Sequence, residues 1–245
     1  MSQLGTAPVR RDRRRISHSM DAVLTEAVAL LDEGGEPALT FRALAARLGG
    51  GVASIYWYVS SRDELLDRAS DFVAEGVLAA IRGLPTTQDP IDDIRTIAVT
   101  LFDGVVDRPW LAAYFLRNTT VQPHSLAIYE HLGQQTLRLD LSPRQQFHAV
   151  SAIIGFVIGS ATDLGQEPPE AVVAGSVTRE AFLELAADQW RRLDPQEYPF
   201  LLHIVEEFAS HDDVDQFRAG LDLLLAGIRL QASNDGERPL PRPDR

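Results

Sequence analysis

Residues 40–66 read TFRALAARLGGGVASIYWYVSSRDELL, the most informative segment of this 245-residue chain. Thr40 stands where a side chain caps a short helix over residues 41–48. Three consecutive glycines, 49–51, then predict a tight turn, and the apolar spacing after them predicts a second short helix over 52–58. This order is typical of a helix-turn-helix, whose second helix enters a DNA major groove. Helical hairpins are also common in proteins that bind no DNA, so the pattern alone leaves both interpretations open.

Helix signals recur along the rest of the chain. Asp89, Ser142 and Asp194 each precede a proline, an order that places a capping residue before the first helical position. No stretch shows the alternation of a half-buried strand, so the expected fold class is all-α. Periodic apolar segments outside the opening motif predict helices over 19–33, 62–82, 90–107, 110–117, 125–139, 143–164, 179–192, 196–209 and 213–232.

The composition excludes several classes of enzyme. The chain has no cysteine, which excludes thiol catalysis and cysteine-bound zinc or iron–sulfur clusters. All 23 basic residues are arginine, so neither Schiff-base chemistry nor a lysine-dependent phosphate loop is available. His124, His131 and His148 lack the i, i+4 spacing of a helix-borne metal site. We therefore expect no enzyme, no cofactor and no metal.

Charge is distributed unevenly along the chain. The formal net charge is −12, yet residues 1–62 hold 8 arginines against 6 acidic residues, and the remainder holds 15 against 29. An acidic body with a weakly basic end suggests that only the N-terminal part meets an anionic partner. Acidic surfaces also serve solubility alone, which is the simpler interpretation of the body.

Nothing in the sequence predicts export or membrane insertion. The run RRDRRR at 10–15 precedes an amphipathic, acid-containing segment, whereas a signal peptide needs an uncharged apolar core. The longest uncharged stretch, 145–162, contains Gln, His, Ser and Gly and is too polar for a confident span. The expected location is cytoplasmic, with no membrane partner.

The stretch 20–66 resembles the DNA-binding domain of TetR-family transcriptional repressors. The family pattern T-x-R-x-L-A-x-x-L-G, followed by L-Y-W-H-V and a basic residue, is matched by Thr40, Arg42, Leu44, Ala45, Leu48, Gly49, Ile55, Tyr56, Trp57, Val59 and Arg62. Tyr58 replaces the usual histidine, and Gly50 and Gly51 replace an apolar and a polar residue. Segments 108–117, 142–159 and 211–228 look similar to the branch that includes the tetracycline repressors. That branch carries a histidine near the end of its long fourth helix, which 72–81 lacks, so magnesium–tetracycline is not the expected effector.

The resemblance implies an organisation and a function. It implies a helix-turn-helix domain (16–66) and a helical effector-binding and dimerisation domain (67–233), and composition predicts a flexible arginine-rich arm (1–15) before them and a disordered tail (234–245) after them. It implies a homodimeric repressor that binds double-stranded operator DNA and is released by a small hydrophobic or aromatic effector. The alternative is a helical dimeric interaction protein that binds no DNA, which would be indifferent to DNA at any salt concentration.

Candidate DNA contacts follow from these positions. The second helix of the motif leads with small residues that offer few hydrogen bonds to base edges, although apolar ones can contact thymine methyls. Arginines at helix starts, bulky polar residues on an exposed helix face and a basic arm suit phosphates or a minor groove. Solvated arginines and ordinary packing are the competing interpretations. The candidates are Arg14, Arg15, Thr40, Arg42, Gly51, Val52, Ala53, Ser54, Tyr56, Trp57, Tyr58 and Arg62.

Two further sets concern the body. Small residues at four-residue intervals on the 143–164 helix let another helix approach closely, and the resemblance implies that this helix and the last one form a four-helix bundle with a second subunit. The candidate interface residues are Ser151, Gly155, Gly159, Phe217, Leu221, Leu224, Leu225 and Ile228. Aromatic side chains either line an effector cavity or form ordinary core. The candidate ligand contacts are Phe102, Trp110, Tyr114, Phe115, Phe147 and Phe156.

Overall fold

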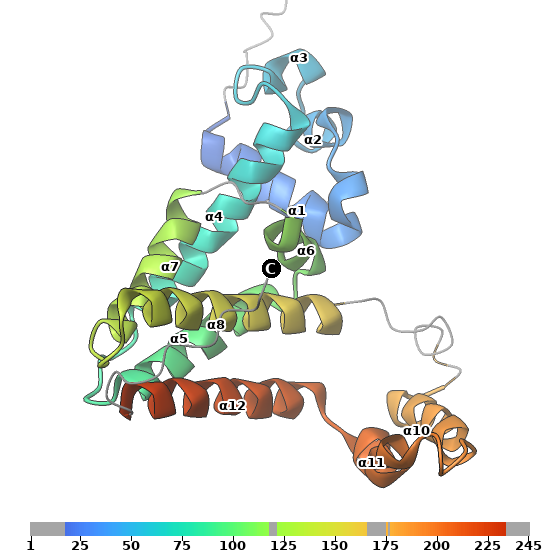
Figure 1. The fold of residues 1–245 in the computed structure, drawn as a ribbon. Helices are drawn as coiled ribbons and strands as arrows, with labels where there is room; N and C mark the ends of the chain where they lie inside the picture. The colour runs from blue at the N-terminus through green and yellow to red at the C-terminus, as the bar shows by residue number, and fades with distance from the viewer. Residues whose placement is uncertain (1–17, 118–121, 166–174, 176, 234–245) are drawn as a thin grey trace, which may run out of the picture. The chain divides into compact units, whose positions relative to one another are not determined.

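The structure, a computed structural model, describes residues 18–117, 122–165, 175 and 177–233. Within these residues every regular element is an α-helix and no strand occurs, which confirms the predicted all-α class (Figure 1). The helices are α1 (Met20–Ala38), α2 (Phe41–Arg47), α3 (Val52–Ile55), α4 (Arg62–Arg82), α5 (Pro90–Val105), α6 (Pro109–Arg117), α7 (Pro123–Thr136), α8 (Pro143–Leu164), α10 (Arg179–Arg191), α11 (Pro199–Ser210) and α12 (Asp213–Ser233).

The chain divides into two compact units, Met1–Ala69 and Ser70–Arg245. The first, which we call the head, holds α1, α2, α3 and the start of α4. The second, the body, holds the rest of α4 and the later helices. Because α4 runs from Arg62 to Arg82, one helix belongs to both units.

The head is built around apolar side chains that all its helices and the turn after α3 contribute. Its most deeply buried members include Val23, Leu31, Leu44, Ile55, Val59 and Leu65. The end of α1 differs from the prediction of a helix over 19–33: helical residues continue to Ala38 but are interrupted at Gly34 and Gly35. Gly35 adopts φ 62°, which a residue with a side chain rarely takes, so the two glycines divide α1 into a long helix and a separate final turn.

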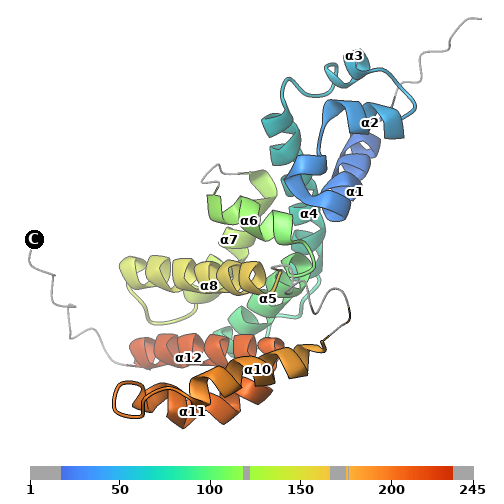
Figure 2. The same ribbon diagram turned by 90° about the vertical axis from the view of Figure 1, so that its right-hand side faces the viewer.

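In the body, α8 and α12 lie side by side (Figures 1 and 2). Phe217 of α12 stacks on Phe102 of α5 with ring centroids 3.8 Å apart, and on Phe156 of α8 at 5.6 Å. A Cβ at Gly220 would lie 2.4 Å from the Phe156 ring, so this approach of α12 to α8 requires glycine. At the start of α8, Ser142 is the capping residue that the sequence predicted, and it forms a capping box with Gln145.

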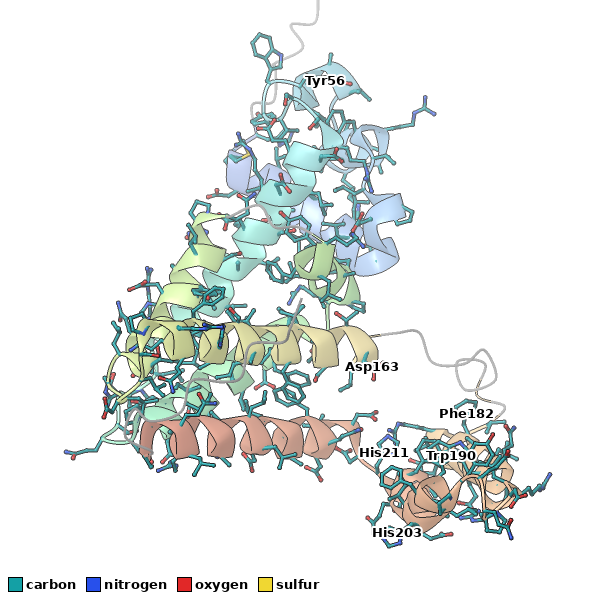
Figure 3. The ribbon with its side chains drawn as sticks, viewed as in Figure 1. Tyr56, Asp163, Phe182, Trp190, His203 and His211 are labelled. Atoms are coloured by element: carbon teal, nitrogen blue, oxygen red, sulfur yellow. The ribbon has the colours of Figure 1, made fainter. Side chains whose placement is uncertain are left out.

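Helices α10 and α11 pack on each other as a hairpin. Trp190 of α10 (Figure 3) stacks on Phe208 of α11 with ring centroids 4.0 Å apart, and Ala187 of α10 and Val205 of α11 are buried. The prediction that α11 begins at residue 196 is wrong, because the Asp194 carboxylate accepts the Gln196 N–H at 2.8 Å within a turn and the helix starts at Pro199.

One helix in the described part of the chain, α8, is long and apolar enough to cross a membrane by length and composition. A core helix of a helical body passes the same test, and α8 packs there through Val150, Ile153, Val157 and Ala161. One such helix does not indicate a membrane protein.

Candidate nucleic-acid interface

The predicted helix-turn-helix is formed by α2, the turn 48–51 and α3. Gly49 adopts φ +66°, and the Gly50 N–H donates to the Ala45 carbonyl at 2.9 Å, which ends α2. The Thr40 hydroxyl accepts the Ala43 N–H at 3.1 Å and caps α2 as predicted. Because Leu44 and Ile55 are buried, the two helices are fixed on the head core and leave their other sides exposed.

The second helix of the motif is shorter than the predicted 52–58. Regular α-helix spans Val52–Ile55, and Tyr56 and Trp57 lie in the turn that follows. Trp57 is 79% exposed and Tyr56 is 60% exposed, and Val52 and Ala53 are also exposed. The Ser54 hydroxyl donates to the Gly51 carbonyl at 2.5 Å. Small and aromatic side chains therefore make up the outer surface of this segment (Figure 3).

Tyr56 is held by its ring and has an unengaged hydroxyl group. The ring packs edge-to-face on Phe41 of α2, with centroids 5.0 Å apart and planes at 86°. The hydroxyl has no hydrogen-bond partner within the described part of the chain. An oriented phenol with an available O–H suits a phosphate oxygen.

Tyr58 and Arg62 serve the head itself instead. The Tyr58 hydroxyl donates to the His18 carbonyl at 2.7 Å. The Arg62 guanidinium donates to the Leu39 carbonyl at 3.0 Å and to the Glu36 carbonyl, both at the end of α1. These hydrogen bonds lie within the head, and the role of the two side chains as DNA contacts stays a prediction.

Among the arginines in the described part of the head, one has no internal partner. Arg47 pairs with Glu33 and Glu26, and Arg68 pairs with Glu64 at 2.7 Å. Arg42, exposed at the start of α2, has no ion pair or hydrogen bond within the described residues. The predicted contacts Arg14 and Arg15 lie outside the described residues.

Glu64 shows how firmly the start of α4 is fixed. The Ser60 hydroxyl and N–H, followed by Arg68, lower the pKa of Glu64 to about 2. Its carboxylate therefore stays ionised and committed to these partners. By accepting both hydrogen bonds from Ser60, it holds the segment that follows the exposed aromatic residues against the first turn of α4.

The residues of α12 that were predicted for the subunit face lie mostly inside the subunit. Phe217, Leu221, Leu225 and Ile228 are buried within the subunit, and Leu224 is half-buried. Apolar periodicity located a buried stripe, but the subunit's own α5 and α8 cover it. The outward side of α12 carries Leu223, 77% exposed, and Leu230.

On α8 the predicted small residues lie outward. Ser151 and Gly155 are exposed, and Gly159 is half-exposed. A Cβ at Gly155 or Gly159 would meet nothing within 4 Å in the subunit. This side of α8 is therefore free to receive another helix.

The aromatic residues predicted to contact a ligand differ in exposure. Phe102, Trp110 and Tyr114 are buried, and Phe115 and Phe156 are half-buried. Phe147 is 61% exposed on the subunit, and its role in ligand binding stays a prediction. A cavity of about 180 Å³ lies elsewhere in the body, with Arg82, Asp93, His131 and Gln135 among its lining residues.

Comparison with known proteins decides the family. Residues 23–69 match the model of bacterial regulatory proteins of the tetR family, and residues 84–232 match that of the tetracyclin repressor-like C-terminal domain. The chain belongs to the TetR family. TetR-family proteins are transcriptional regulators rather than enzymes in general; they bind operator DNA, function as dimers and bind small-molecule effectors.

Individual relatives agree with this assignment. An HTH-type transcriptional regulator of Saccharopolyspora erythraea is 31% identical over 153 residues, which are 62% of this chain and 64% of that protein, just under two thirds of its length. The HTH-type transcriptional repressor DrrR1 of Streptomyces coeruleorubidus is 26% identical over 230 residues, covering 89% of this chain and 80% of that one.

Solved TetR structures have the same fold. SCO7222, a TetR from Streptomyces coelicolor, superposes with a TM-score of 0.73 at 34% identity, over 88% of this chain and all of that one. ActR of the same organism, in complex with actinorhodin, gives 0.73 at 22% identity, over 89% of this chain and all of ActR.

Proposed function

We propose that this TetR-family chain is a homodimeric repressor that binds a pseudo-palindromic operator with the α2–α3 motif of each subunit. The observation that carries the proposal is the surface of that motif, where Val52, Tyr56 and Trp57 are exposed over a packed core. Repression, rather than activation, is supported by the similarity to the repressor DrrR1. Such a regulator acts in the cytoplasm, where bacterial DNA lies.

Some of the proposed DNA contacts position the motif on the DNA backbone, and others read the bases. Tyr56 donates to a phosphate, Arg42 pairs with one, and Thr40 offers its remaining hydroxyl proton at the start of the same helix. Gly51 lets the DNA backbone come near, because nothing lies within 4 Å of its Cβ position. These residues fix the register without reading sequence.

Reading depends on small apolar side chains. Val52 and Ala53 contact thymine methyl groups, Trp57 adds apolar surface, and Ser54 supplies one short hydroxyl. Few donors on the motif mean that DNA shape and the arginine-rich segment 1–15 supply part of the specificity.

The dimer is formed through the outward sides of α8 and α12. Ser151, Gly155 and Gly159 provide a close approach, and Leu223 and Leu230 provide apolar area that the subunit leaves uncovered. Leu224 is half-buried and lies at the edge of this face, between the buried and the outward sides of α12. Burial of exposed leucines stabilises association by about 25 cal/mol per Å² of apolar surface removed from water.

A small hydrophobic or aromatic molecule releases the operator. Support comes from ActR, which has the same fold and was solved with actinorhodin. Trp110, Tyr114 and Phe115 of α6 are the proposed contacts. Phe102 and Phe156 already pack on Phe217, so a ligand between them must separate stacked rings.

The experiment is selection of duplexes from a randomised DNA pool by the wild-type protein. We expect one enriched pseudo-palindrome, here called the selected duplex, whose affinity falls steeply with salt. A protein that enriches no sequence and ignores DNA at low salt would instead be a helical interaction protein.

A further inference from the structure

The first turn of α7 is capped by a residue from another helix. The N-cap residue of α7, Gln122, makes no side-chain capping hydrogen bond. Asp71 of α4 takes that role: its Oδ1 accepts the His124 N–H at 2.9 Å, and its Oδ2 lies 2.9 Å from His124 Nδ1. One carboxylate thus holds both the backbone and the side chain of one residue in the first turn of α7.

This arrangement differs from that of two other proline-started helices of the body, α5 and α8. Asp89 caps α5 and Ser142 caps α8, each from the residue directly before the proline. Such local caps form wherever their helix lies. The cap from Asp71 forms only when α4 lies against the start of α7, so its stabilisation depends on the position of α4.

The contact is also sheltered. The Asp71 side chain is 15% exposed and that of His124 is 33% exposed. Hydrogen bonds to an ionised group are stronger than neutral ones, and partial exclusion of water weakens competition for them. The cap therefore holds α4 more firmly than a fully exposed pair would.

We infer that Asp71 is a positioning residue for operator binding, an inference that rests on the proposed function. Because α4 begins in the head and continues in the body, its position in the body sets where it presents the head. Loss of the cap lets α4 occupy more positions. DNA with fixed half-site spacing binds only a fraction of them, and apparent affinity falls by that fraction.

The test measures binding of the selected duplex by Asp71→Ala, with Glu75→Ala as a matched control on the exposed side of the same helix. We expect Asp71→Ala to bind about tenfold more weakly, within the range of typical coupling between sites. The dependence of affinity on salt stays the same, because every residue that binds a phosphate is still present. Asp71→Asn keeps an oxygen for the His124 N–H and is weakened less, and Glu75→Ala binds as the wild type does.

A second variant separates the position of α4 from the capping of α7. Adding Gln122→Asp to Asp71→Ala gives α7 a local cap, as Asp89 does for α5. Hydrogen exchange at the first turn of α7 should then slow to the wild-type rate while operator affinity stays low. Hydrogen exchange reports the capping of α7, and operator affinity reports the position of α4.

Two outcomes overturn the inference. Binding of the selected duplex by Asp71→Ala that equals or exceeds that of the wild type excludes the role of Asp71 in presenting the head. Full recovery of affinity by Gln122→Asp assigns the loss to α7 capping alone. Failure of the wild-type protein to enrich any duplex is a different result, which removes the proposed function itself.

Discussion

Single side chains of the head divide between holding the fold and facing outward. Tyr56 rests its ring on Phe41 and keeps its hydroxyl available, whereas Tyr58, two residues later, donates to His18. Arg62 donates to carbonyls at the end of α1, whereas Arg42 has no partner among the described residues. Tyr56 and Arg42 are therefore available for contacts with phosphates.

Tyr56→Phe tests the outward hydroxyl. The ring and its packing on Phe41 remain, so folding should be unchanged. Loss of one hydrogen bond to phosphate should weaken binding by about 1 kcal/mol, roughly fivefold, for the selected duplex and for unrelated DNA alike. Fluorescence anisotropy on both duplexes measures this. Unchanged affinity would exclude the phosphate contact, and a loss confined to the selected duplex would make Tyr56 a base reader.

Replacing Asp93 tests how much a buried carboxylate contributes to the stability of the body. Its burial opposes ionisation, but the Thr87 amide and Arg138 outweigh that effect and lower the pKa of Asp93 below its usual 3.8. A carboxylate whose pKa is lower in the folded than in the unfolded protein stabilises the fold fully at any pH above its unfolded pKa. This stabilisation is lost as the pH falls through its folded pKa. Asp93→Asn should therefore cost about 1–3 kcal/mol at pH 7, and less as pH falls below about 4.

Urea unfolding at several pH values checks this, with the exposed neighbour Asp92→Asn as control, expected to change stability by no more than about 0.5 kcal/mol. A pH-independent difference for Asp93→Asn would assign its effect to shape and not to charge.

At the scale of helices, local chemistry was predictable and partner identity was not. Thr40 and Ser142 cap their helices as expected, because capping depends on residues within one turn. The stripe Phe217, Leu221, Leu225 was correctly apolar, but periodicity says only that a stripe is covered, and it is covered here by the subunit's own helices. Likewise nothing near Gln122 indicates that Asp71, far back in the chain, caps α7.

The outward side of α8 gives a direct test of assembly. In Gly155→Arg the new side chain starts in open space within the subunit, so the variant should keep its helicity. At a helix–helix contact the unpaired charge costs about 3 kcal/mol or more, which weakens the dimer more than 100-fold. Sedimentation measures this, with Gly76→Arg, another open and exposed helical glycine, as control. A Gly155→Arg dimer as tight as the wild type would exclude this face.

Removing the arginine-rich segment or the Arg42 side chain tests how much each contributes to phosphate binding. Deleting residues 1–15, which hold Arg10, Arg11, Arg13, Arg14 and Arg15, should reduce the slope of log K against log salt by about 0.9 for each phosphate that the arginines neutralise. Arg42→Ala should reduce the slope by the amount expected for about one phosphate. Identical slopes for the truncated and complete proteins would leave the segment without a role in phosphate binding.

For the whole molecule, the fold class, the motif and the family followed from sequence, because a helix-turn-helix is encoded within one contiguous segment. The effector contacts stay a prediction. Aromatic residues such as Phe102 and Phe147 look alike in sequence, yet one is buried and the other is exposed. Only packing between distant helices distinguishes them, and sequence spacing does not report it.

In the proposed homodimer, two copies of the α2–α3 motif read one operator together. Hydroxyl-radical footprinting of the wild-type protein on the selected duplex tests it most directly, with Tyr56→Phe and Gly155→Arg compared at the same concentrations. We expect two symmetric protected patches about one helical turn apart, roughly 34–36 Å, which weaken together in Tyr56→Phe and disappear together in Gly155→Arg. A single protected patch that Gly155→Arg retains at wild-type strength would contradict it.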